Sequence, residues 1–392
     1  MGKALLRGGI KVVMFGTFSF LVAIPLATWT EPFLTAPLEQ GFVFVQSRGL
    51  PLHPLDEKGV PQVYYPRLGK AFDNPVYVCM YAYGYYQLWK GSHEYDYFLK
   101  YYALHLPKGL SAQEYRECFF SCADWLVSRL KPRELEGKTF YVWEYSFPWK
   151  VYNLDPPWVS GMAQGCGIEV LVRAYRESGD SRYLDAARKA LTAFTIPVES
   201  GGVVRKDSQD AWWYEEYASP TCKESRVLNG MTHTLIGIYH YWKETGDPEA
   251  AELLRKGLRA LKQELPKYDT GQWTYYDQLG QIAKLKYHHI NVNTVEHLGQ
   301  LTGEKFLIDT AQRWKNYRSN YFTRYFIWQK PLRFYTVLFG LNIILCGVVI
   351  SIIYLGVKYI LKFPKRKQQG LPPTTEDGNN ENLYIHQCTF ME

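Results

Sequence analysis

The chain lacks several signatures that would assign it to common functional classes. It has no zinc-finger, basic-zipper or aromatic single-strand-binding pattern, so we expect no nucleic-acid partner. None of the glycine fingerprints that cradle nucleotides or nicotinamide is present, and we therefore expect no cofactor of these kinds. No Asn-x-Ser/Thr triplet occurs either, so glycosylation cannot report which side of a membrane the chain faces.

Cysteine is scarce, with seven residues and hence an odd total. Cys118 and Cys122 lie four positions apart without a matching ligand pair elsewhere, so we predict no metal site. Cys346 falls in an apolar run and Cys388 in a polar tail, which leaves five cysteines for the rest of the chain. A disulfide between any two of these five stays open.

Two long apolar runs, at residues 12–29 and 334–357, have about the length needed to cross a bilayer core. The first follows basic residues and has no clean small-x-small cleavage site, so we predict a retained signal anchor at residues 1–30. The second is followed by five basic residues, which predicts a cytoplasmic C-terminus, although basic residues before it weaken this prediction. Together they predict a membrane protein with residues 31–330 on the lumenal or extracytoplasmic side.

The rest of the composition is that of a globular protein with a modest positive charge. An apolar content of 47% over 392 residues supports a substantial core. The formal charge of +7 has the sign expected of a protein that handles a polyanion. Residues 358–392 begin with basic residues and continue with polar ones, which predicts a disordered cytoplasmic tail.

Three segments share the order helix, glycine, acidic residue, helix, at Gly179-Asp180, Gly246-Asp247 and Gly303-Glu304. Glycine favours the left-handed helix C-cap, and an acidic residue suits the start of the next helix. Because roughly 60 residues separate the glycines, a helical hairpin with a long loop fits better than a short solenoid repeat. We therefore predict a mainly α fold, with an (α/α) toroid or barrel-like catalytic domain at residues 70–325.

Other segments complete the predicted organisation. Helices are expected at residues 76–90 and 112–130, the second with Ser111 as N-cap. Residues 31–69 are rich in Pro, Gly and Val, and we predict a short extended or β segment there.

The segment Trp213-Tyr214-Glu215-Glu216-Tyr217 places two carboxylates beside aromatic and phenolic side chains. Glu and Tyr act as general acids or bases when burial and neighbouring charges move their pKa values toward the working pH. An exposed acidic and aromatic loop is the alternative. The segment Arg226-Val227-Leu228-Asn229-Gly230 follows nine residues after Tyr217.

The order of these strings along the chain is also informative. The full set is Asn74-Pro75-Val76, Trp149, residues 157–165, Gly201-Gly202-Val203, residues 213–217, residues 227–230, Tyr268-Asp269-Thr270-Gly271 and Tyr287-His288. With these strings the sequence resembles the C-terminal catalytic domain of the D-glucuronyl C5-epimerases over about residues 70–318. The resemblance implies conversion of D-glucuronate to L-iduronate in a heparosan or heparan-type glycan, by C5 proton abstraction and reprotonation from the opposite face.

The resemblance also implies partners and a location. It predicts an anionic polysaccharide substrate, a homodimer or a complex with other glycan-modifying membrane enzymes, and a Golgi membrane if the protein is eukaryotic. Animal members carry a larger β-rich region before the helical domain, whereas about forty residues are available here.

The resemblance assigns catalytic roles to four residues by their place in the strings: Glu216, Tyr217, Tyr276 and Tyr287. Glu215 is then a capping or salt-bridge residue. Tyr287 is a core tyrosine in the alternative interpretation, since the chain has 32 tyrosines. The interval between Tyr276 and Tyr287 is shorter than we expect for animal members, so we expect a difference from theirs in substrate length or identity.

Candidate substrate-binding residues were selected by charge, aromaticity and position. Arg205 and Lys206 suit a clamp on a carboxylate or sulfate, with a solvated charge pair as the equally weighted alternative. The other candidates are Trp158, Trp213, Asn229 and His288, of which Trp158 is also a candidate for helix packing. Adjacent histidines point apart, so His288 and His289 are poor joint metal ligands.

Two other functions compete with the epimerase. A polysaccharide lyase abstracts the same C5 proton but then cleaves the chain. A non-catalytic membrane protein would use the same cleft to bind glycans or to assemble with other enzymes.

Overall fold

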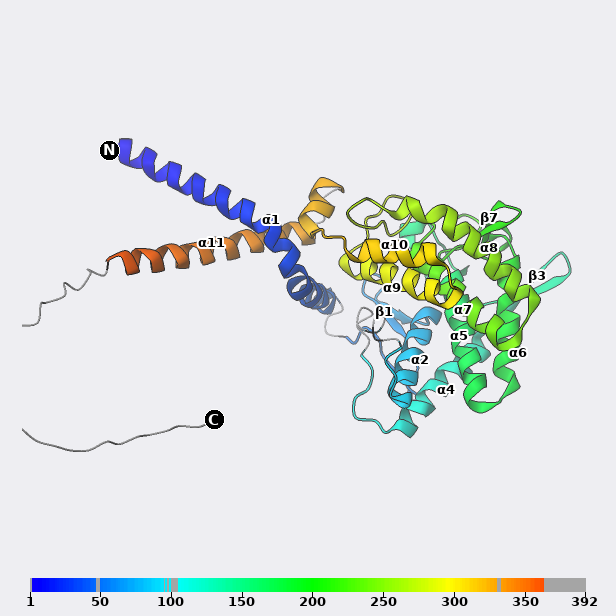
Figure 1. Cartoon of the computed structure of the whole chain (residues 1–392). Helices are drawn as coiled ribbons and strands as arrows, with labels where there is room; N and C mark the ends of the chain where they lie inside the picture. The colour runs from blue at the N-terminus through cyan, green and yellow to red at the C-terminus, as the bar shows by residue number, and fades with distance from the viewer. Residues whose placement is uncertain are drawn as a thin grey trace, which may run out of the picture. The chain divides into compact units, whose positions relative to one another are not determined.

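The structure is a computed structural model that describes residues 2–46, 50–94, 96, 99, 105–329 and 333–362. Within these residues helices dominate and all strands are short (Figure 1). The mainly α class predicted from the sequence is confirmed. The contacts divide the chain into two units inside the last helix, between Cys346 and Gly347.

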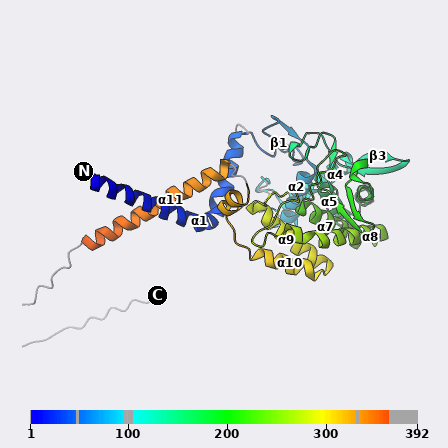
Figure 2. The same ribbon diagram turned by 90° about the horizontal axis from the view of Figure 1, so that it is seen from above.

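Among the residues that the structure describes, eight helices pair into four hairpins. The first helices of the pairs, here called the inner helices, contact one another in the order α2, α5, α7, α9. Figures 1 and 2 show the hairpins following one another around an arc. The pairs are α2 (Pro75–Lys90) with α4 (Ala112–Arg129), α5 (Gly161–Ser178) with α6 (Ser181–Leu191), α7 (Leu228–Thr245) with α8 (Pro248–Glu264), and α9 (Leu285–Thr302) with α10 (Lys305–Lys315).

Burial distinguishes the two members of each hairpin. The inner helix α5 is buried on every face from Gly161 to Ala174. Its partner α6 buries only one stripe, which includes Tyr183, Ala186 and Ala190 at helical spacing. An amphipathic stripe is typical of a helix with one face toward solvent, so the second helices form the outer layer.

The predicted helix boundaries are confirmed by the caps. Gly179, Gly246 and Gly303 all adopt the left-handed C-cap conformation. The side chains of Asp180 and Asp247 then accept a hydrogen bond from a backbone N–H in the first turn of the next helix. The helices predicted at residues 76–90 and 112–130 correspond to α2 and α4, and Ser111 forms a capping box with Glu114 at the start of α4.

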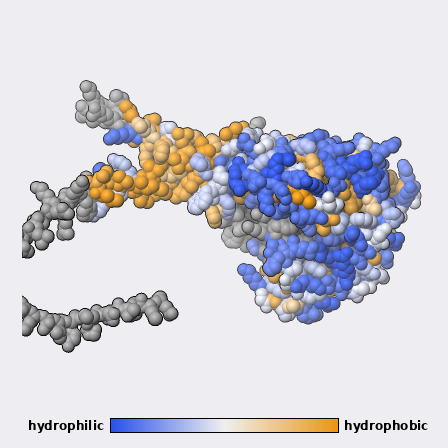
Figure 3. All heavy atoms as spheres, viewed as in Figure 1, coloured by the Kyte–Doolittle hydropathy of each residue, from blue (hydrophilic) through white to orange (hydrophobic). Residues whose placement is uncertain are grey.

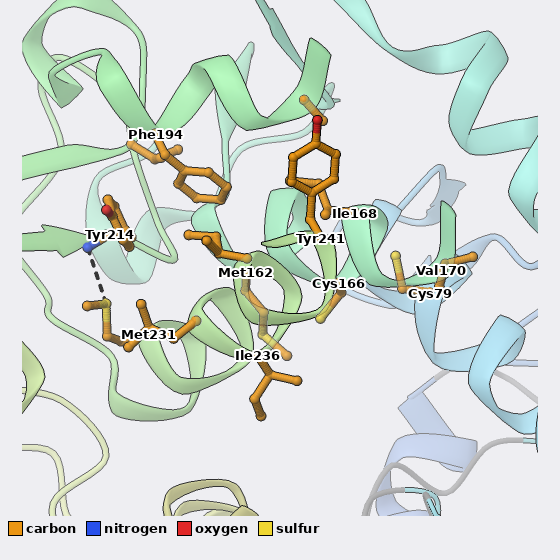
Figure 4. Close-up of a cluster of buried hydrophobic side chains, with 14 of the residues drawn as sticks. Cys79, Met162, Cys166, Ile168, Val170, Phe194, Tyr214, Met231, Ile236 and Tyr241 are labelled. Atoms are coloured by element: carbon orange, nitrogen blue, oxygen red, sulfur yellow. Dashed lines mark hydrogen bonds between the residues drawn. The ribbon is translucent and has the colours of Figure 1, made fainter. Parts of the chain in front are cut away.

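Glycines allow the inner helices α5 and α7 to approach each other closely. A Cβ on Gly165 would lie 2.4 Å from the Cα of Thr234, and one on Gly237 would lie 2.0 Å from the carbonyl oxygen of Gly165. Around this contact the core packs Met162 of α5 against apolar side chains of α7 and of the connections (Figure 4). In the same cluster the backbone N–H of Tyr214 points at the sulfur of Met231, 3.4 Å away.

The strands form four two-stranded antiparallel sheets, mostly in the connections between hairpins. They fix the chain that enters the inner helices α2, α5 and α7. The pairs are β1 (Val63–Tyr65) with β2 (Lys70–Phe72), β3 (Lys131–Leu135) with β4 (Lys138–Val142), β5 (Glu144–Tyr145) with β6 (Trp158–Val159), and β7 (Val204–Ser208) with β8 (Ala211–Tyr214).

The prediction of an extended segment at residues 31–69 was wrong in its first part. Helix α1 runs from Gly2 to Gln46, and the short strands begin only at Val63. We attribute the difference to helix propagation, since adding a residue to an existing helix costs much less than starting one. Good helix formers such as Leu34, Ala36 and Leu38 continue the helix past the prolines in this segment.

Two helices are long and apolar enough to cross a membrane by length and composition: residues Gly9–Leu34 of α1 and Arg333–Leu361 of α11 (Arg333–Lys362). Figure 3 shows hydrophobic side chains covering both helices. These ranges include the predicted runs at residues 12–29 and 334–357. The predicted tail overlaps the end of α11 up to Lys362, and its remaining part, residues 363–392, lies outside the described residues.

The six cysteines within the described residues are free thiols. Cys118 and Cys122 are both on α4. No group of three or more His, Cys, Asp and Glu side chains in the described part of the chain is arranged to hold a metal ion.

Candidate active site

A cavity of about 190 Å³ collects six of the ten predicted site residues. The six are Trp158, Glu216, Tyr217, Asn229, Tyr276 and Tyr287. They come from β6, from the chain after β8, from the start of α7, from the loop before α9 and from the start of α9. Segments up to about 130 residues apart therefore meet at one site, as the predicted motifs require.

The cavity lies at the N-terminal ends of the inner helices. Tyr77 is in the first turn of α2, Met162 in that of α5, Asn229 in that of α7 and Tyr287 in that of α9. Each helix N-terminus carries a partial positive charge from its aligned peptide dipoles. Four such ends at one cavity favour a negatively charged ligand or intermediate there.

The structure separates the two adjacent carboxylates. Glu216 lines the cavity, whereas Glu215 does not. Glu215 is fully buried and accepts hydrogen bonds at 3.1 Å from the Ser225 hydroxyl and from the backbone N–H of Arg226. Strand β8 ends at Tyr214, and the chain then bends at Glu216 and Tyr217, which line the cavity while Glu215 does not.

The backbone around Glu215 joins two of the predicted strings. The N–H of Gly161, the first residue of α5, donates to the Glu215 carbonyl at 2.7 Å. A Cβ on Gly161 would lie 2.7 Å from the same oxygen, so this close approach requires glycine. Arg226 has a positive φ of 45°. This backbone conformation turns its N–H toward the Glu215 carboxylate.

The Glu216 carboxylate lies in surroundings that favour its neutral form. Burial raises its pKa from the ordinary 4.5 to about 8, and a hydrogen bond with Tyr217 acts in the opposite direction. Its Oε2 has no hydrogen-bond partner among the residues that the structure describes. A carboxyl group with a pKa near neutrality can both accept and return a proton.

Tyr217 is held by stacking. Its ring lies 4.4 Å from that of Tyr152, with an angle of 20° between the planes. The Tyr152 hydroxyl donates to Asp277 at 2.9 Å, which fixes the stacking partner. Burial raises the pKa of Tyr217 well above its usual range, so its hydroxyl stays protonated near neutral pH.

Tyr276 and Tyr287 are two further phenols of the cavity, and the Tyr276 side chain forms a hydrogen bond with Tyr217. Their ring centroids are 4.7 Å apart. Burial raises the pKa of Tyr276 well above its usual range, and the charge of Glu216 adds to this. The Tyr276 carbonyl accepts from the N–H of Leu228 at 3.2 Å, which ties this loop to the start of α7.

The predicted carboxylate clamp is not at the cavity. Lys206 is exposed on β7, with its ammonium 4.7 Å from the centre of the Trp212 ring. Arg205 pairs with Glu199 at 2.5 Å and lies 3.6 Å from Glu215. The β7–β8 pairing places Arg205 opposite Trp213, away from the cavity lining. From there its guanidinium can neutralise the charge of the buried Glu215 carboxylate.

Trp213 and His288 also differ from their predicted roles in substrate binding. Trp213 is fully buried in the core and stacks on Tyr268, with ring centroids 6.1 Å apart. The His288 ring stacks on Trp273 at 3.7 Å, and its Nδ1 lies 3.0 Å from the Thr274 hydroxyl. His288 lines a second cavity instead of the one around Glu216.

Sequence reasoning did not nominate the other ten residues of the lining. Most are aromatic or apolar, and Tyr65, Phe147 and Trp149 lie close together among them. Five of them, Asn74, Val76, Trp149, Ser160 and Met162, belong to the strings that carry the family resemblance, which was the available signal. The ten are Val63, Tyr65, Asn74, Val76, Tyr77, Tyr145, Phe147, Trp149, Ser160 and Met162.

Within the described part of the chain, no Lys or Arg side chain lines this cavity. Uncharged donors are present instead. Asn229 is almost completely buried, and its Oδ1 has no hydrogen-bond partner among the described residues. The free Oδ1 can therefore accept a hydrogen bond from a hydroxyl of a ligand, whereas the Nδ2, which lies 3.9 Å from the Met162 sulfur, and the phenols can donate to a carboxylate.

Comparison with known proteins supports the family resemblance that the sequence strings indicate. Residues 136–316 match the model of the D-glucuronyl C5-epimerase C-terminus. A D-glucuronyl C5-epimerase from Caenorhabditis elegans is 38% identical over 224 residues, which are 52% of this chain and 35% of that protein. The chain thus spans about a third of the length of the nematode enzyme.

Two further similarities extend the comparison. An uncharacterized protein from Methanocaldococcus jannaschii is 32% identical over 225 residues, covering 56% of this chain and 72% of that protein. A GH76 α-mannanase structure from Bacteroides thetaiotaomicron has a TM-score of 0.43 at 13% identity, over 86% of this chain and 87% of that one. From the matched sequences, the chain belongs to the D-glucuronyl C5-epimerase family.

Proposed function

We propose that the protein is a polysaccharide uronate C5-epimerase that converts D-glucuronate to L-iduronate in a heparosan or heparan-type glycan, on a domain built as an α/α toroid. The observation that carries this proposal is the position of Glu216. Its carboxyl group, with a pKa of about 8, shares a small cavity with three tyrosines. The family membership supports a carbohydrate epimerase.

The proposed chemistry uses Glu216 and a phenol on opposite faces of the sugar. Ionised Glu216 accepts the C5 proton, and the C–H electron pair passes into the adjacent carboxylate to give an enolate-like intermediate. A protonated tyrosine, Tyr276 or Tyr287, then donates a proton to the other face of C5. The raised pKa of Tyr276 keeps its hydroxyl protonated until this step.

The intermediate carries extra negative charge on the uronate carboxylate. In this proposal the N-terminal ends of α2, α5, α7 and α9 stabilise that charge, together with the Asn229 amide. Fixed dipoles in a site that excludes water act more strongly than the same groups in solution. This arrangement takes the place of the arginine clamp expected at Arg205.

The size and walls of the cavity fit one sugar ring. At about 190 Å³ it is smaller than pockets for drug-sized ligands, which span roughly 300–1,000 Å³. Trp158 stacks on Tyr145 with ring centroids 3.8 Å apart, so a rigid aromatic wall borders the cavity. Such a surface supports an apolar sugar face, while neighbouring sugars of the polymer would extend out of the site.

We further propose that α1 and α11 both cross a membrane, with the hairpin domain on the lumenal or extracytoplasmic side. The lengths and compositions of the two helices support this topology. A protease added to sealed vesicles should leave residues 50–329 protected and remove the C-terminal end. Removal of the hairpin domain from intact vesicles would contradict the topology.

Isotope exchange tests the proposed reaction. The full-length protein, purified in detergent, is incubated with heparosan and with N-sulfated heparosan in deuterated water, and the products are examined by NMR. Deuterium at C5, iduronate and unchanged chain length are expected with at least one polymer. Shortened chains with an unsaturated end would identify a lyase, and no exchange on either polymer would contradict the proposed substrate class.

A further inference from the structure

A second cavity, of about 370 Å³, lies between α1 and the hairpin domain. One wall is formed by Thr28, Glu31 and Pro32 of α1. The facing wall comes from Trp273, from the first half of α9, and from the end of α10 and the chain after it, including Lys315 and Arg318. None of these residues lines the cavity around Glu216, so this is a separate site.

Specific polar contacts hold the two walls of this second cavity together. The Asn320 side chain donates to the Ile24 carbonyl at 3.1 Å and to the Thr28 hydroxyl at 3.0 Å. Glu31 forms a buried ion pair with Arg324, whose guanidinium lies 4.4 Å from the centre of the Trp273 ring. These contacts fix α1 against the domain and neutralise the one carboxylate in the lining.

The remaining charges of the lining are positive. Lys315 and Arg318 are exposed at the cavity, and the nearest acidic partner of Lys315 is Glu296, 3.8 Å away. The guanidinium of Arg318 donates to two backbone carbonyls but forms no ion pair among the described residues. Ser319 is 8% exposed, and its hydroxyl has no hydrogen-bond partner in the same part of the chain.

The position of the cavity along α1 suggests the source of an anion. Thr28, Glu31 and Pro32 are in the last part of the apolar segment Gly9–Leu34, where a membrane span would end. Headgroup phosphates occupy this level of a bilayer. Basic pockets beside membrane helices bind such headgroups, and Trp side chains favour the same depth.

We propose that this cavity binds the phosphate-bearing headgroup of a membrane phospholipid. Lys315 and Arg318 bind the phosphate, the Ser319 hydroxyl donates to it, and the apolar residues Pro32 and Trp273 accommodate the start of the lipid tails. The proposal requires α1 to enter the membrane, but it does not require the epimerase reaction.

Native mass spectrometry of the full-length protein can test lipid binding. The protein is released from nanodiscs that contain equal amounts of phosphatidylglycerol and a phosphate-free galactolipid. Wild type should retain phosphatidylglycerol in preference to the galactolipid. The variant Lys315→Ala/Arg318→Ala should retain on the order of tenfold less, because it removes both cations that bind the phosphate. Equal retention of the two lipids by wild type would overturn the proposal.

Two further variants separate binding from charge and folding. Ser319→Leu keeps both cations but fills the cavity, and it should also reduce retention. Lys138→Ala/Lys305→Ala removes the same charge from β4 and α10, away from both cavities, and should retain lipid as wild type does. Wild-type lipid retention by Lys315→Ala/Arg318→Ala would contradict the assignment. A loss of lipid by the control as large as that of Lys315→Ala/Arg318→Ala would contradict it too.

Competition identifies the source of the anion. Lipid retention should resist millimolar inorganic phosphate and heparosan oligosaccharides. Displacement by phosphate would reveal a site for a soluble anion, and displacement by heparosan would reveal a polysaccharide site, and either would overturn the lipid assignment. C5 exchange measured on the same samples shows separately whether the proposed reaction occurs, so the two proposals can fail independently.

Discussion

Gly230 leaves the space that the Glu216 side chain occupies. A Cβ on Gly230 would lie 2.5 Å from both Cβ and Oε2 of Glu216. The Asn-Gly string at the start of α7 therefore positions the acidic string that follows β8. This contact explains in physical terms why the two strings occur together in the sequence.

Gly230→Ala should displace the Glu216 carboxylate. We expect a loss of about 1–3 kcal/mol in unfolding free energy from overpacking, and a decrease in C5 exchange of roughly a hundredfold because the base moves from its productive position. Thermal unfolding and exchange in deuterated water measure the two effects. In a Glu216→Gln background the same substitution should lower exchange little further, and a full additional decrease would show that Gly230 does not act through Glu216.

Glu216→Gln should reduce C5 exchange by roughly a hundredfold to ten-thousandfold, because it removes the proposed base and keeps the side-chain size. Glu215→Gln is the matched control, since Glu215 is equally buried but does not line the cavity. The control should retain exchange to within about tenfold and lose stability, because it weakens contacts with Ser225 and Arg226. The opposite order of activities would reassign the base to Glu215.

Glu216 should make the stability of the protein fall as pH rises from about 5 to 8, in opposition to buried histidines such as His233, whose pKa burial lowers to about 4. In the unfolded chain Glu216 loses its proton near 4.5, but in the folded protein it keeps the proton up to about 8. Between these values the folded state binds more protons, so stability falls by about 1.4 kcal/mol per pH unit from this group.

Glu215, whose pKa burial raises to about 7, contributes with the same sign. Chemical denaturation of wild type and Glu216→Gln across this pH range measures the difference. Relative to the variant, wild type should lose stability as pH rises, because the histidine contributions are common to both proteins, and equal slopes would show that Glu216 does not titrate in this range.

Arg205 and Lys206 should behave differently despite being neighbours. Arg205→Ala removes the ion pair with the buried Glu215 carboxylate. We therefore expect a loss of about 1–3 kcal/mol in unfolding free energy. Lys206→Ala changes an exposed strand residue and should alter stability by less than about 0.5 kcal/mol. Neither variant should raise the KM for heparosan as the loss of a carboxylate clamp would. A large rise in KM with unchanged stability in Arg205→Ala would instead support the predicted role of Arg205 in binding the substrate carboxylate.

Much of the hairpin architecture could be predicted from local sequence. Gly179 with Asp180, and Gly246 with Asp247, specify a helix end and the next helix start through interactions within a few residues. The position of α1 beyond Glu31 could not be predicted in the same way, because its prolines and glycine indicate a break while helix propagation continues through them.

The candidate site was predictable only in part. Glu216, Tyr217 and Tyr287 belong to strings that carry the family resemblance, and the structure brings them together. Arg205 is also close to these strings in sequence, but strand pairing with Trp213 determines which side it occupies. That pairing depends on tertiary packing and has no local signal.

The convergence of the inner helices has a further consequence for mutagenesis. The positive potential at the cavity comes from peptide groups, which every residue type carries. Alanine scanning would therefore find no single cationic side chain that accounts for anion stabilisation, even if the contribution is large. Replacing a first-turn peptide bond of α7 or α9 with an ester, through an incorporated hydroxy acid, would remove one N–H dipole and reveal its effect on the reaction directly.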